Sequence, residues 1–525
     1  MPAHAVHASH SAHTGHSDSS TSQRPHLPTI IIAAGGLGLL IGWLAISLFV
    51  HFTTPHGELH LDATLNSDTQ SRLSTLLADL ELWEDLTVST ELTPTAKDGV
   101  LLNVYLPVTG FYNSISSLST EEFTTLTTSF TTNHSDSAAD ATNPATLPAP
   151  DSTAITLVPL AGLTADLKLL AVDDQYYLDT LNSGALFEYL TFNGDPETVT
   201  AAKTLAQPLN LATPTADTTL TLAQTGVTAL SRGMYSKLQQ VGDGSYFAAH
   251  LADYLSRFDL THTSNEASFT DAANSENICS NPAMLDALTS IGLDIVELTG
   301  NHNQDCGDEA ALTTLNLYHS LGIRTVGGGA TADDAAQPLE INADGAHLTL
   351  LAYNLSTGGY TTDNTPGANL YTEEKAKSDI AAAKARGDFI IVDVQYYECN
   401  AYASTYEDPT CDYADSAAGD QIGFFRHLID LGADLVVGTA AHQPQTYELY
   451  GDGAIYYGLG NLFFDQIWWP GTTRSLILVH YFWQDQHLQT RIVPTVYDDT
   501  YQTTLMNSAS ATAFLHRLNS ARPSL

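Results

Sequence analysis

The sequence is poor in basic residues. Lys and Arg together number 18 of 525 residues, against 59 Asp and Glu, so the formal net charge is −41. A surface with this charge repels nucleic acid and anionic lipid head groups, which excludes a nucleic-acid-binding function. The acidity suits a protein exposed to a salty medium or to the outside of a cell. An acidic polymer would bind such a surface only through bridging cations.

Cysteine is also scarce. The four cysteines, Cys279, Cys306, Cys399 and Cys411, fall as two local pairs in the C-terminal half of the chain. An even number of cysteines in an exported domain indicates disulfides, although four cysteines allow three arrangements. The spacing favours Cys279 with Cys306 and Cys399 with Cys411. A zinc site is the alternative, but no CxxC spacing supports it.

Charged residues are missing altogether from residues 30–52, an apolar run long enough to cross a bilayer as a helix. The run is too long for a cleaved signal peptide, and no small-x-small cleavage site follows it. Arg24 is the only basic residue before the run, and none follows until Arg72, which favours an N-terminus inside the cell. We therefore predict a single-pass signal anchor at residues 29–52, after a disordered, histidine-rich tail at 1–28.

The rest of the chain is predicted to lie outside the cell membrane as two α/β domains. After a linker at residues 53–60, a smaller α/β domain is expected at 61–215 and a larger one at 218–500, with a C-terminal tail at 501–525. In the larger domain, strand patterns alternate with helix patterns and polar residues follow the strands, which is typical of a layered α/β architecture.

The loop after one of these strands contains several groups suited to chemistry. Residues 296–307 read VELTGNHNQDCG, in which an apolar strand ends at Gly300 and is followed by Asn301, His302 and Asp305. Open α/β sheets place their sites at the carboxyl ends of strands. An amide oxygen, an imidazole and a carboxylate suit a divalent metal ion. A polar turn that caps the next helix explains Asn301, His302 and Asp305 equally well.

Two further strands end in the same manner. Residues 435–437 form an apolar strand that stops at Gly438, and His442 lies in the loop that follows. Residues 455–457 form another strand, which runs into Gly-Leu-Gly and Asn461. Three junctions of strand, glycine and polar residue in one domain favour a site over simple turns.

These motifs together resemble the CapA family, named for a poly-γ-glutamate capsule synthesis protein. The similar segments are TGNHNQDCG (299–307), GIRTVGGG (322–329), LIDLGADLVVG (428–438), AHQPQ (441–445), YYGLGNLFFDQ (456–466) and the Asn-Glu motif in SNEASF (264–269). The resemblance spans roughly residues 218–500 and implies a layered, calcineurin-like metallophosphatase sandwich. Residues 61–215 are similar to the solute-binding-like domains that precede the CapA domain in some relatives.

Carried across residue by residue, the resemblance implies a set of site residues. The divalent metal ion, of unknown identity, would be held by Asn265, Glu266, Asn301, His302 and His442. His302 would act as a general acid, with Asp305 beside it. Trp468 and Trp469 would stack on a sugar or polymer, although buried packing explains them equally.

Structural roles are the alternative for the same residues. Glu266 would pair with Arg232 or Arg257, and His442 would be a core histidine. For Asn461 and Asp465, which match the family's terminal motif, the structural role is favoured.

The sequence also departs from the family pattern at three places. Gly226 is followed by Val227 where the family has Gly-Asp, Gln395 stands where the family has a histidine, and Thr439-Ala440 replaces one or two histidines. A two-metal centre needs a bridging anionic ligand and several others. The residues that remain would hold one metal ion weakly or none.

The resemblance and the predicted anchor together imply a membrane-bound protein of capsule synthesis. It would act on an anionic polymer such as poly-γ-glutamate, or on a peptidoglycan-linked substrate, in synthesis, attachment or release, beside other capsule synthesis proteins. A metallophosphatase-like hydrolase that works by metal-assisted hydrolysis or transfer is favoured. The alternatives are a non-catalytic polymer-binding or assembly factor with a degraded metal site, and a phosphoesterase for small substrates.

Overall fold

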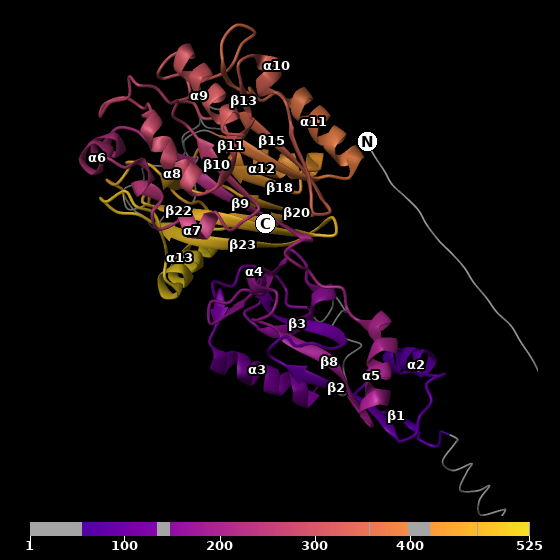
Figure 1. Cartoon of the computed structure of the whole chain (residues 1–525). Coiled ribbons are helices and arrows are strands. Elements are labelled where there is room, and N and C mark those ends of the chain that lie inside the picture. Colours follow the sequence, from indigo (N-terminus) through magenta and orange to yellow (C-terminus); the bar gives the residue numbers. More distant parts are fainter. Residues whose placement is uncertain (1–54, 134–146, 356–357, 397–419, 470, 524–525) are drawn as a thin grey trace, which may run out of the picture. The chain divides into compact units, whose positions relative to one another are not determined.

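The computed structural model describes residues 55–133, 147–355, 358–396, 420–469 and 471–523 (Figure 1). The predicted anchor, the histidine-rich tail, Cys399 and Cys411 lie outside these ranges. Among the described residues, no helix combines the length and the apolar character needed to cross a membrane. The chain divides into two compact units, Met1–Glu58 with Glu81–Asp85, and Leu59–Leu80 with Leu86–Leu525. The fold described below is that of the second unit.

The N-terminal part of this unit is a mixed sheet with helices, in the order β1-β2-β8-β3-β5, with β6 also paired to β3. Its strands are β1 (Leu59–Leu61), β2 (Leu86–Thr93), β3 (Leu101–Gly110), β5 (Thr156–Pro159), β6 (Leu167–Leu169) and β8 (Leu186–Asn193), with β4 (Ser117–Leu118) paired to β7 (Ala171–Val172). Its helices are α2 (Ser67–Leu76), α3 (Thr120–Asn133), α4 (Tyr177–Thr180) and α5 (Pro196–Leu205). Helix α5 begins where Asp195 accepts hydrogen bonds from the next turn and Pro196 takes the first helical position.

The C-terminal part contains a pair of larger sheets within the described residues. The first has the order β12-β11-β10-β9-β22-β23-β24, with β21 also beside β9, and the second has the order β14-β15-β17-β18-β20-β19. The strands of the first are β9 (Thr219–Thr228), β10 (Leu260–Asn265), β11 (Leu293–Glu297), β12 (Arg324–Val326), β21 (Asn461–Phe463), β22 (Arg474–Trp483), β23 (Gln486–Val496) and β24 (Thr504–Leu505). Those of the second are β14 (Leu339–Ala343), β15 (Ala346–Asn354), β17 (Phe389–Gln395), β18 (Leu435–Gly438), β19 (Tyr447–Tyr450) and β20 (Gly453–Tyr456).

Helices cover the outer faces of these sheets, which gives a layered α/β sandwich (Figure 1). These helices are α6 (Gly233–Val241), α7 (Ala252–Leu255), α8 (Leu285–Ser290), α9 (Asp308–Ser320), α11 (Glu373–Arg386) and α12 (Gln421–Leu431). Helix α10 (Ala332–Ala335) lies beside the strand pair β13 (Gly328–Gly329) and β16 (Gly367–Ala368), and α13 (Ser508–Ser520) contributes Phe514 and Leu515 to the apolar cluster between the sheets. Between the sheets, Ile295 of β11 and Ile391 of β17 belong to one apolar cluster. On the outside, Tyr318 of α9 packs on the first sheet, and Ile380 of α11 packs with Val392 on the second. The expected α/β class is therefore confirmed, with several sheets in the described residues.

The parallel strands bring their carboxyl ends to a common edge in each sheet. Ser264 of β10 lies opposite Glu297 of β11 and opposite Val227 of β9. In the second sheet, Val394 of β17 lies opposite Gly438 of β18. The loops that follow these strands carry the polar motifs of the sequence, so side chains from distant segments converge there.

Gly226 allows a further segment to join this edge. A Cβ atom at Gly226 would lie 1.9 Å from the carbonyl oxygen of Gly460, an oxygen that instead accepts a hydrogen bond from the Val227 amide at 2.9 Å. Only glycine permits this approach. The close contact places β21, and with it Asn461, beside the end of β9.

Candidate functional site

The end of strand β10 supplies a buried carboxylate. Asn265 and Glu266 are both fully buried, and the Glu266 amide donates to the Thr228 carbonyl oxygen at 2.9 Å. The Glu266 carboxylate accepts a hydrogen bond from Gln395 Nε2 at Oε1, over 3.2 Å. The Asn265 side chain donates to the Ala267 carbonyl oxygen, while its Oδ1 is buried without a donor among the described residues.

Gln395, at the end of β17, connects this carboxylate to the glycine-rich loop. Its Nε2 also donates to Asn301 Oδ1, at 3.1 Å, while its Oε1 accepts from Thr439 Oγ1 at 3.4 Å. The loop comes this close because Gly300 has no side chain: a Cβ atom there would lie 2.8 Å from both Cα and Cγ of Glu266. Asn301 and Glu266, both expected at the site, are therefore joined through a residue at which the sequence departs from the family.

His442 reaches the same carboxylate from the loop after β18. Its Nδ1 lies 2.9 Å from Asn461 Oδ1, and the Asn461 amide nitrogen donates to Gln466 Oε1 and to the Thr472 carbonyl oxygen, each at 3.1 Å. The orientation of the Asn461 amide requires the His442 proton to sit on Nδ1. In the neutral ring, Nε2 is then the nitrogen with the lone pair, and it lies 3.9 Å from Glu266 Oε2. This separation is too long for a hydrogen bond.

We name Asn265 Oδ1, the Glu266 carboxylate, Asn301 Oδ1 and His442 Nε2 the acceptor cluster. The described residues contain no group of three His, Cys, Asp or Glu side chains that could hold a metal ion. The cluster instead combines one carboxylate and one imidazole with amide oxygens, which are ligands for divalent cations. The 3.9 Å separation of His442 Nε2 and Glu266 Oε2 fits a cation between these two groups, and Asn265 Oδ1, at the same strand end as Glu266, is buried without a donor among the described residues. Asn461 would then orient the His442 imidazole through its hydrogen bond with Nδ1, as hydrogen-bond partners of metal-binding histidines do.

His302 and Asp305 lie at a more exposed position. His302 Nδ1 is 2.8 Å from Asp305 Oδ2, and the two side chains are 25% and 39% exposed. A carboxylate only accepts, so His302 donates from Nδ1, and its Nε2 is the nitrogen that takes up or releases a proton. This pair therefore suits proton transfer better than it suits ligation of a buried cation.

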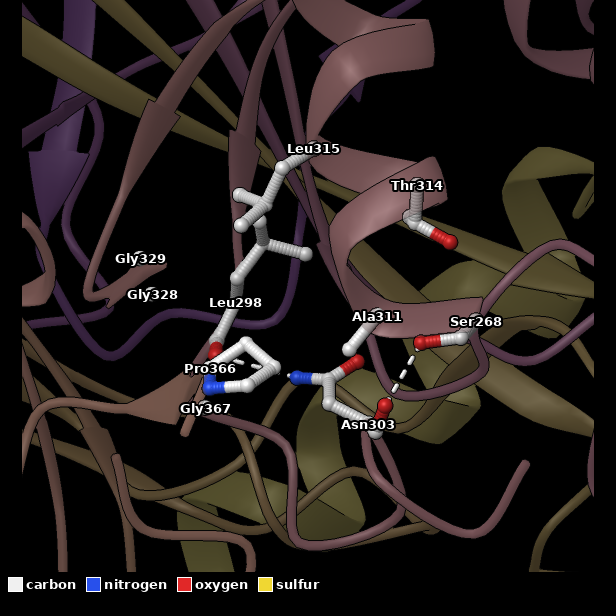
Figure 2. Close-up of a pocket in the computed structure, with 10 residues that line it drawn as sticks. All are labelled: Ser268, Leu298, Asn303, Ala311, Thr314, Leu315, Gly328, Gly329, Pro366 and Gly367. Carbon is white, nitrogen blue, oxygen red and sulfur yellow. Dashed lines mark hydrogen bonds between the residues drawn. The ribbon is translucent and has the colours of Figure 1, made fainter. Parts of the chain in front are cut away.

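The loop that carries these residues is held at several points. Asn303 donates from Nδ2 to the Leu298 carbonyl oxygen at 3.0 Å, and Ser268 Oγ donates to the Asn303 carbonyl oxygen at 2.6 Å, beside a cavity of about 20 Å³ (Figure 2). Cys279 and Cys306 form the predicted disulfide, with Cα atoms 6.1 Å apart. These ties fix the loop from both sides.

Asp465 and Arg232 form an ion pair near the site. Asp465, almost fully buried, accepts from Arg232 Nη2 at 2.6 Å and from the Gly233 amide at 3.0 Å, at the start of α6. The Arg232 guanidinium stacks on Phe464, whose ring also contacts His442. Asp465 thus stabilises the fold around the site. Arg232, one of the two cations considered for Glu266, pairs with Asp465 instead. Arg257, the other cation considered for Glu266, pairs with Asp179.

The two tryptophans follow this segment directly. Trp468 is 62% exposed, and its ring meets that of Trp469 edge-on, with centroids 6.0 Å apart. The Trp469 carbonyl oxygen accepts a hydrogen bond from Thr472 Oγ1 at 2.9 Å, which ties the segment to the residues that hold Asn461. Trp468 therefore offers an exposed aromatic face close in sequence to the site.

Buried titratable residues that the sequence analysis missed lie behind the acceptor cluster. Burial, and then the charge of Asp393, raise the pKa of Glu297 to about 7. His262 Nε2 lies 3.2 Å from Asp393 Oδ2, and both side chains are fully buried. A signal for Asp393 was present in the sequence, because a single aspartate interrupts the apolar residues of FIIVDVQ. No such signal marked His262, because LTHTSN is polar at every position after its leucine.

Comparison with known proteins gives the family of this region. Residues 221–466 match the family described as bacterial capsule synthesis protein PGA_cap. The capsule biosynthesis protein CapA of Bacillus anthracis is 22% identical over 280 residues, which cover 51% of this chain and 64% of that protein. The PGA biosynthesis protein CapA of Bacillus subtilis is 24% identical over 233 residues, covering 44% and 57%. The chain thus spans less than two thirds of the length of either relative.

Solved structures add little to this. A hypothetical protein of Thermus thermophilus aligns with 53% of this chain and 99% of its own, at 12% identity and a TM-score of 0.31. A second protein of that organism, TT1561, gives 11% identity over 55% and 100% of the two chains, and a TM-score of 0.28. Scores this low carry no argument about the fold. The sequence match does carry one about the family: residues 221–466 belong to the bacterial capsule synthesis family of PGA_cap and CapA proteins.

Proposed function

We propose that this protein acts on an extracellular anionic polymer of the poly-γ-glutamate type, in its synthesis, attachment or release, through a divalent cation held by the acceptor cluster. The observation that carries the proposal is the convergence of Asn265, Glu266, Asn301 and His442 inside the region that matches the family. Relatives named for capsule and PGA biosynthesis support the polymer class.

A divalent cation would also reduce the electrostatic repulsion between this acidic protein and an acidic polymer. A chain with a formal net charge of −41 repels an acidic polymer, and the Glu266 carboxylate adds to that repulsion at the site. A divalent cation would offset the charge where polymer and protein meet, and as a Lewis acid it would polarise an acyl or phosphoryl oxygen. Trp468 would hold a neighbouring part of the polymer on its exposed face.

The residues around the cluster would supply the other parts of a hydrolysis or transfer reaction. Asp305 holds the His302 ring by its Nδ1, so that the protonated ring would give its Nε2 proton to the leaving group while water, or the acceptor group in a transfer, attacks the substrate. Asn461 keeps His442 in the tautomer that presents Nε2 to the site. The disulfide and the hydrogen bonds of Asn303 keep the loop in place during these steps.

A non-catalytic polymer-binding or assembly role is the second candidate. The observation that favours it is the burial of Glu266 and His442, which are 0% and 1% exposed and so give a polymer little direct access. In that role the cluster would bind a cation that stabilises the fold, and Trp468 would provide the polymer contact.

Incubation of the full chain with poly-γ-glutamate of defined length, with and without Mn²⁺, tests the proposal. Polymer length is followed by gel filtration, and bound polymer by co-sedimentation. The enzyme role predicts Mn²⁺-dependent shortening that Glu266→Gln abolishes and Glu276→Gln, an exposed control, does not. Retention of the polymer without shortening selects the assembly role. If the polymer is neither shortened nor retained, the proposed substrate class is wrong.

We also propose that residues 29–52 anchor the chain in the cell membrane with its bulk outside. The apolar, uncharged run and the position of Arg24 support this orientation. Protease added to intact cells should then digest most of the chain. An undigested chain under conditions that digest a known surface protein would show the opposite orientation.

A further inference from the structure

We propose that the side-chain amide of Gln395 takes the place of a second cation, so that the acceptor cluster binds one divalent cation rather than two. The inference rests on the cation site of the proposed function and adds its stoichiometry. It concerns the side of the cluster where Glu266 Oε1 and Asn301 Oδ1 face each other.

The contacts of Gln395 carry the argument. One nitrogen, Nε2, donates to both Glu266 Oε1 and Asn301 Oδ1, at 3.2 and 3.1 Å. A primary amide has two N–H groups, and these bonds use both of them. The nitrogen therefore stands between two oxygens of the kind that bind divalent cations. Its position is nearly equidistant from them, as that of a bridging ion would be.

The orientation of the amide follows from its partners. A carboxylate cannot donate, so the group that faces Glu266 must be the NH₂ group and not the carbonyl oxygen. Thr439 Oγ1 donates to the Gln395 Oε1 on the other side, at 3.4 Å. Gln395 is fully buried at the end of β17, and its hydrogen bonds to Glu266, Asn301 and Thr439 hold the amide in this orientation.

The two sides of the cluster therefore differ in the charge that they accept. On one side, Glu266 Oε2 and His442 Nε2 lie 3.9 Å apart with Asn265 Oδ1 at the same strand end, and these groups fit a cation. On the other side, the two hydrogens of the Gln395 amide would lie against any cation that approached the same oxygens. A cation and the amide compete for this side, and in this chain the amide is part of the fold.

Gln395→Glu is the sharpest test, because it keeps the shape of the side chain and replaces the NH₂ group by an oxygen. Three oxygens, two of them from carboxylates, would then converge where the amide nitrogen lies, which suits a hard divalent cation. Bound Mn²⁺ is counted on the full chain by equilibrium dialysis and elemental analysis. The histidines of residues 1–28 are common to all variants, so differences between variants report on the site. The expected result is one more Mn²⁺ per chain than in the parent protein.

Gln421→Glu is the matched control. Gln421 is also buried, and its Nε2 also donates to two oxygens, Gln445 Oε1 and the Tyr457 carbonyl oxygen, each at 3.3 Å, but neither belongs to a carboxylate. This variant should gain no Mn²⁺. An equal gain in both variants would show that any buried carboxylate attracts Mn²⁺, and it would overturn the inference.

Folding is followed by the thermal unfolding midpoint of each variant. Without Mn²⁺, Gln395→Glu places two carboxylates together and should unfold at a lower temperature than the parent, and Mn²⁺ should raise its midpoint more than that of the parent. A variant that folds only with Mn²⁺ supports the inference for the same reason. Gln395→His, which offers an imidazole nitrogen to the same position, is the second variant. Folded Gln395→Glu and Gln395→His proteins without extra Mn²⁺ overturn it.

The parent protein provides a test that needs no new side chain at Gln395. The difference in bound Mn²⁺ between the parent and Glu266→Gln should be one. A difference of two overturns the inference and leaves the proposed cation site intact. A difference of zero contradicts the cation site of the proposed function, while the gain in Gln395→Glu still decides the role of the amide.

Discussion

Replacing Glu297 by glutamine should remove a pH-dependent loss of stability. Burial, and then the charge of Asp393, raise the pKa of Glu297 from 4.5 to about 7. The unfolded chain releases this proton near its ordinary pKa, whereas the folded protein keeps it until about pH 7. Between these values the unfolded state binds fewer protons, so the free energy of unfolding falls as the pH rises, and it levels off above pH 7.

The size of the effect follows from the two pKa values. The folded-state value of about 7 against 4.5, at about 1.4 kcal/mol for each pKa unit, corresponds to about 3 kcal/mol of stability that Glu297 removes at pH 8. Glutamine is neutral at every pH, and its carbonyl oxygen still accepts from the Thr299 amide and hydroxyl, which now bond to Glu297 Oε1. Glu297→Gln should therefore equal the parent at pH 4.5 and exceed it by about 3 kcal/mol at pH 8.

Urea unfolding of the full chain at pH 4.5 and pH 8, followed by tryptophan fluorescence, measures the difference. Glu276→Gln, on an exposed loop, is the control and should shift stability by less than about 0.5 kcal/mol at either pH. The same offset between Glu297→Gln and the parent at both pH values would refute the reasoning, since the folded protein keeps the Glu297 carboxyl protonated at pH 4.5 and buries its charge only at pH 8.

Three other changes should separate the roles of the loop and the aromatic surface. Replacing Cys279 and Cys306 by serine opens a link between residues 27 positions apart. Urea unfolding should show a loss of about 3.5 kcal/mol from the loop-closure entropy, and an unchanged free energy of unfolding would contradict this. Gly300→Ala places a methyl group 2.8 Å from Glu266 Cα and Cγ. The overpacking should lower the free energy of unfolding by about 1–3 kcal/mol and reduce the amount of bound Mn²⁺. Unchanged Mn²⁺ content would show that the loop does not shape the cation site. Trp468→Ala, at a side chain that is 62% exposed, should weaken co-sedimentation with poly-γ-glutamate and leave the unfolding midpoint unchanged, and unaltered polymer retention would assign the contact elsewhere.

The strand ends of the larger domain could be predicted from the sequence. The apolar run before Gly300 is β11, and the runs before Gly438 and Gly458 are β18 and β20, because short apolar segments that end in glycine and polar residues are typical of buried parallel strands. The disulfide of Cys279 with Cys306 followed from local spacing. Motifs in the expected order were enough to indicate the family, which the match over residues 221–466 confirms.

The contacts inside the site could not be predicted in the same way. Gln395 lies 129 positions from Glu266 and 94 from Asn301, and only the pairing of sheets determines that its amide bridges them. From the sequence, Gln395 was a missing ligand, whereas in the structure it is a donor that satisfies two acceptors. Asp465 gave no sign of its partner either, because its ion pair with Arg232 joins segments 233 positions apart.

Metal content of the full chain, purified without chelator and without metal-affinity resin, tests the central claim most directly. Elemental analysis would compare the parent with a Glu266→Gln, His442→Ala double variant that has the same N-terminal histidines. We expect one equivalent of divalent metal in the parent beyond the amount in a folded double variant. Equal metal content in the two proteins would contradict it, because the buried carboxylate and imidazole would then hold no cation.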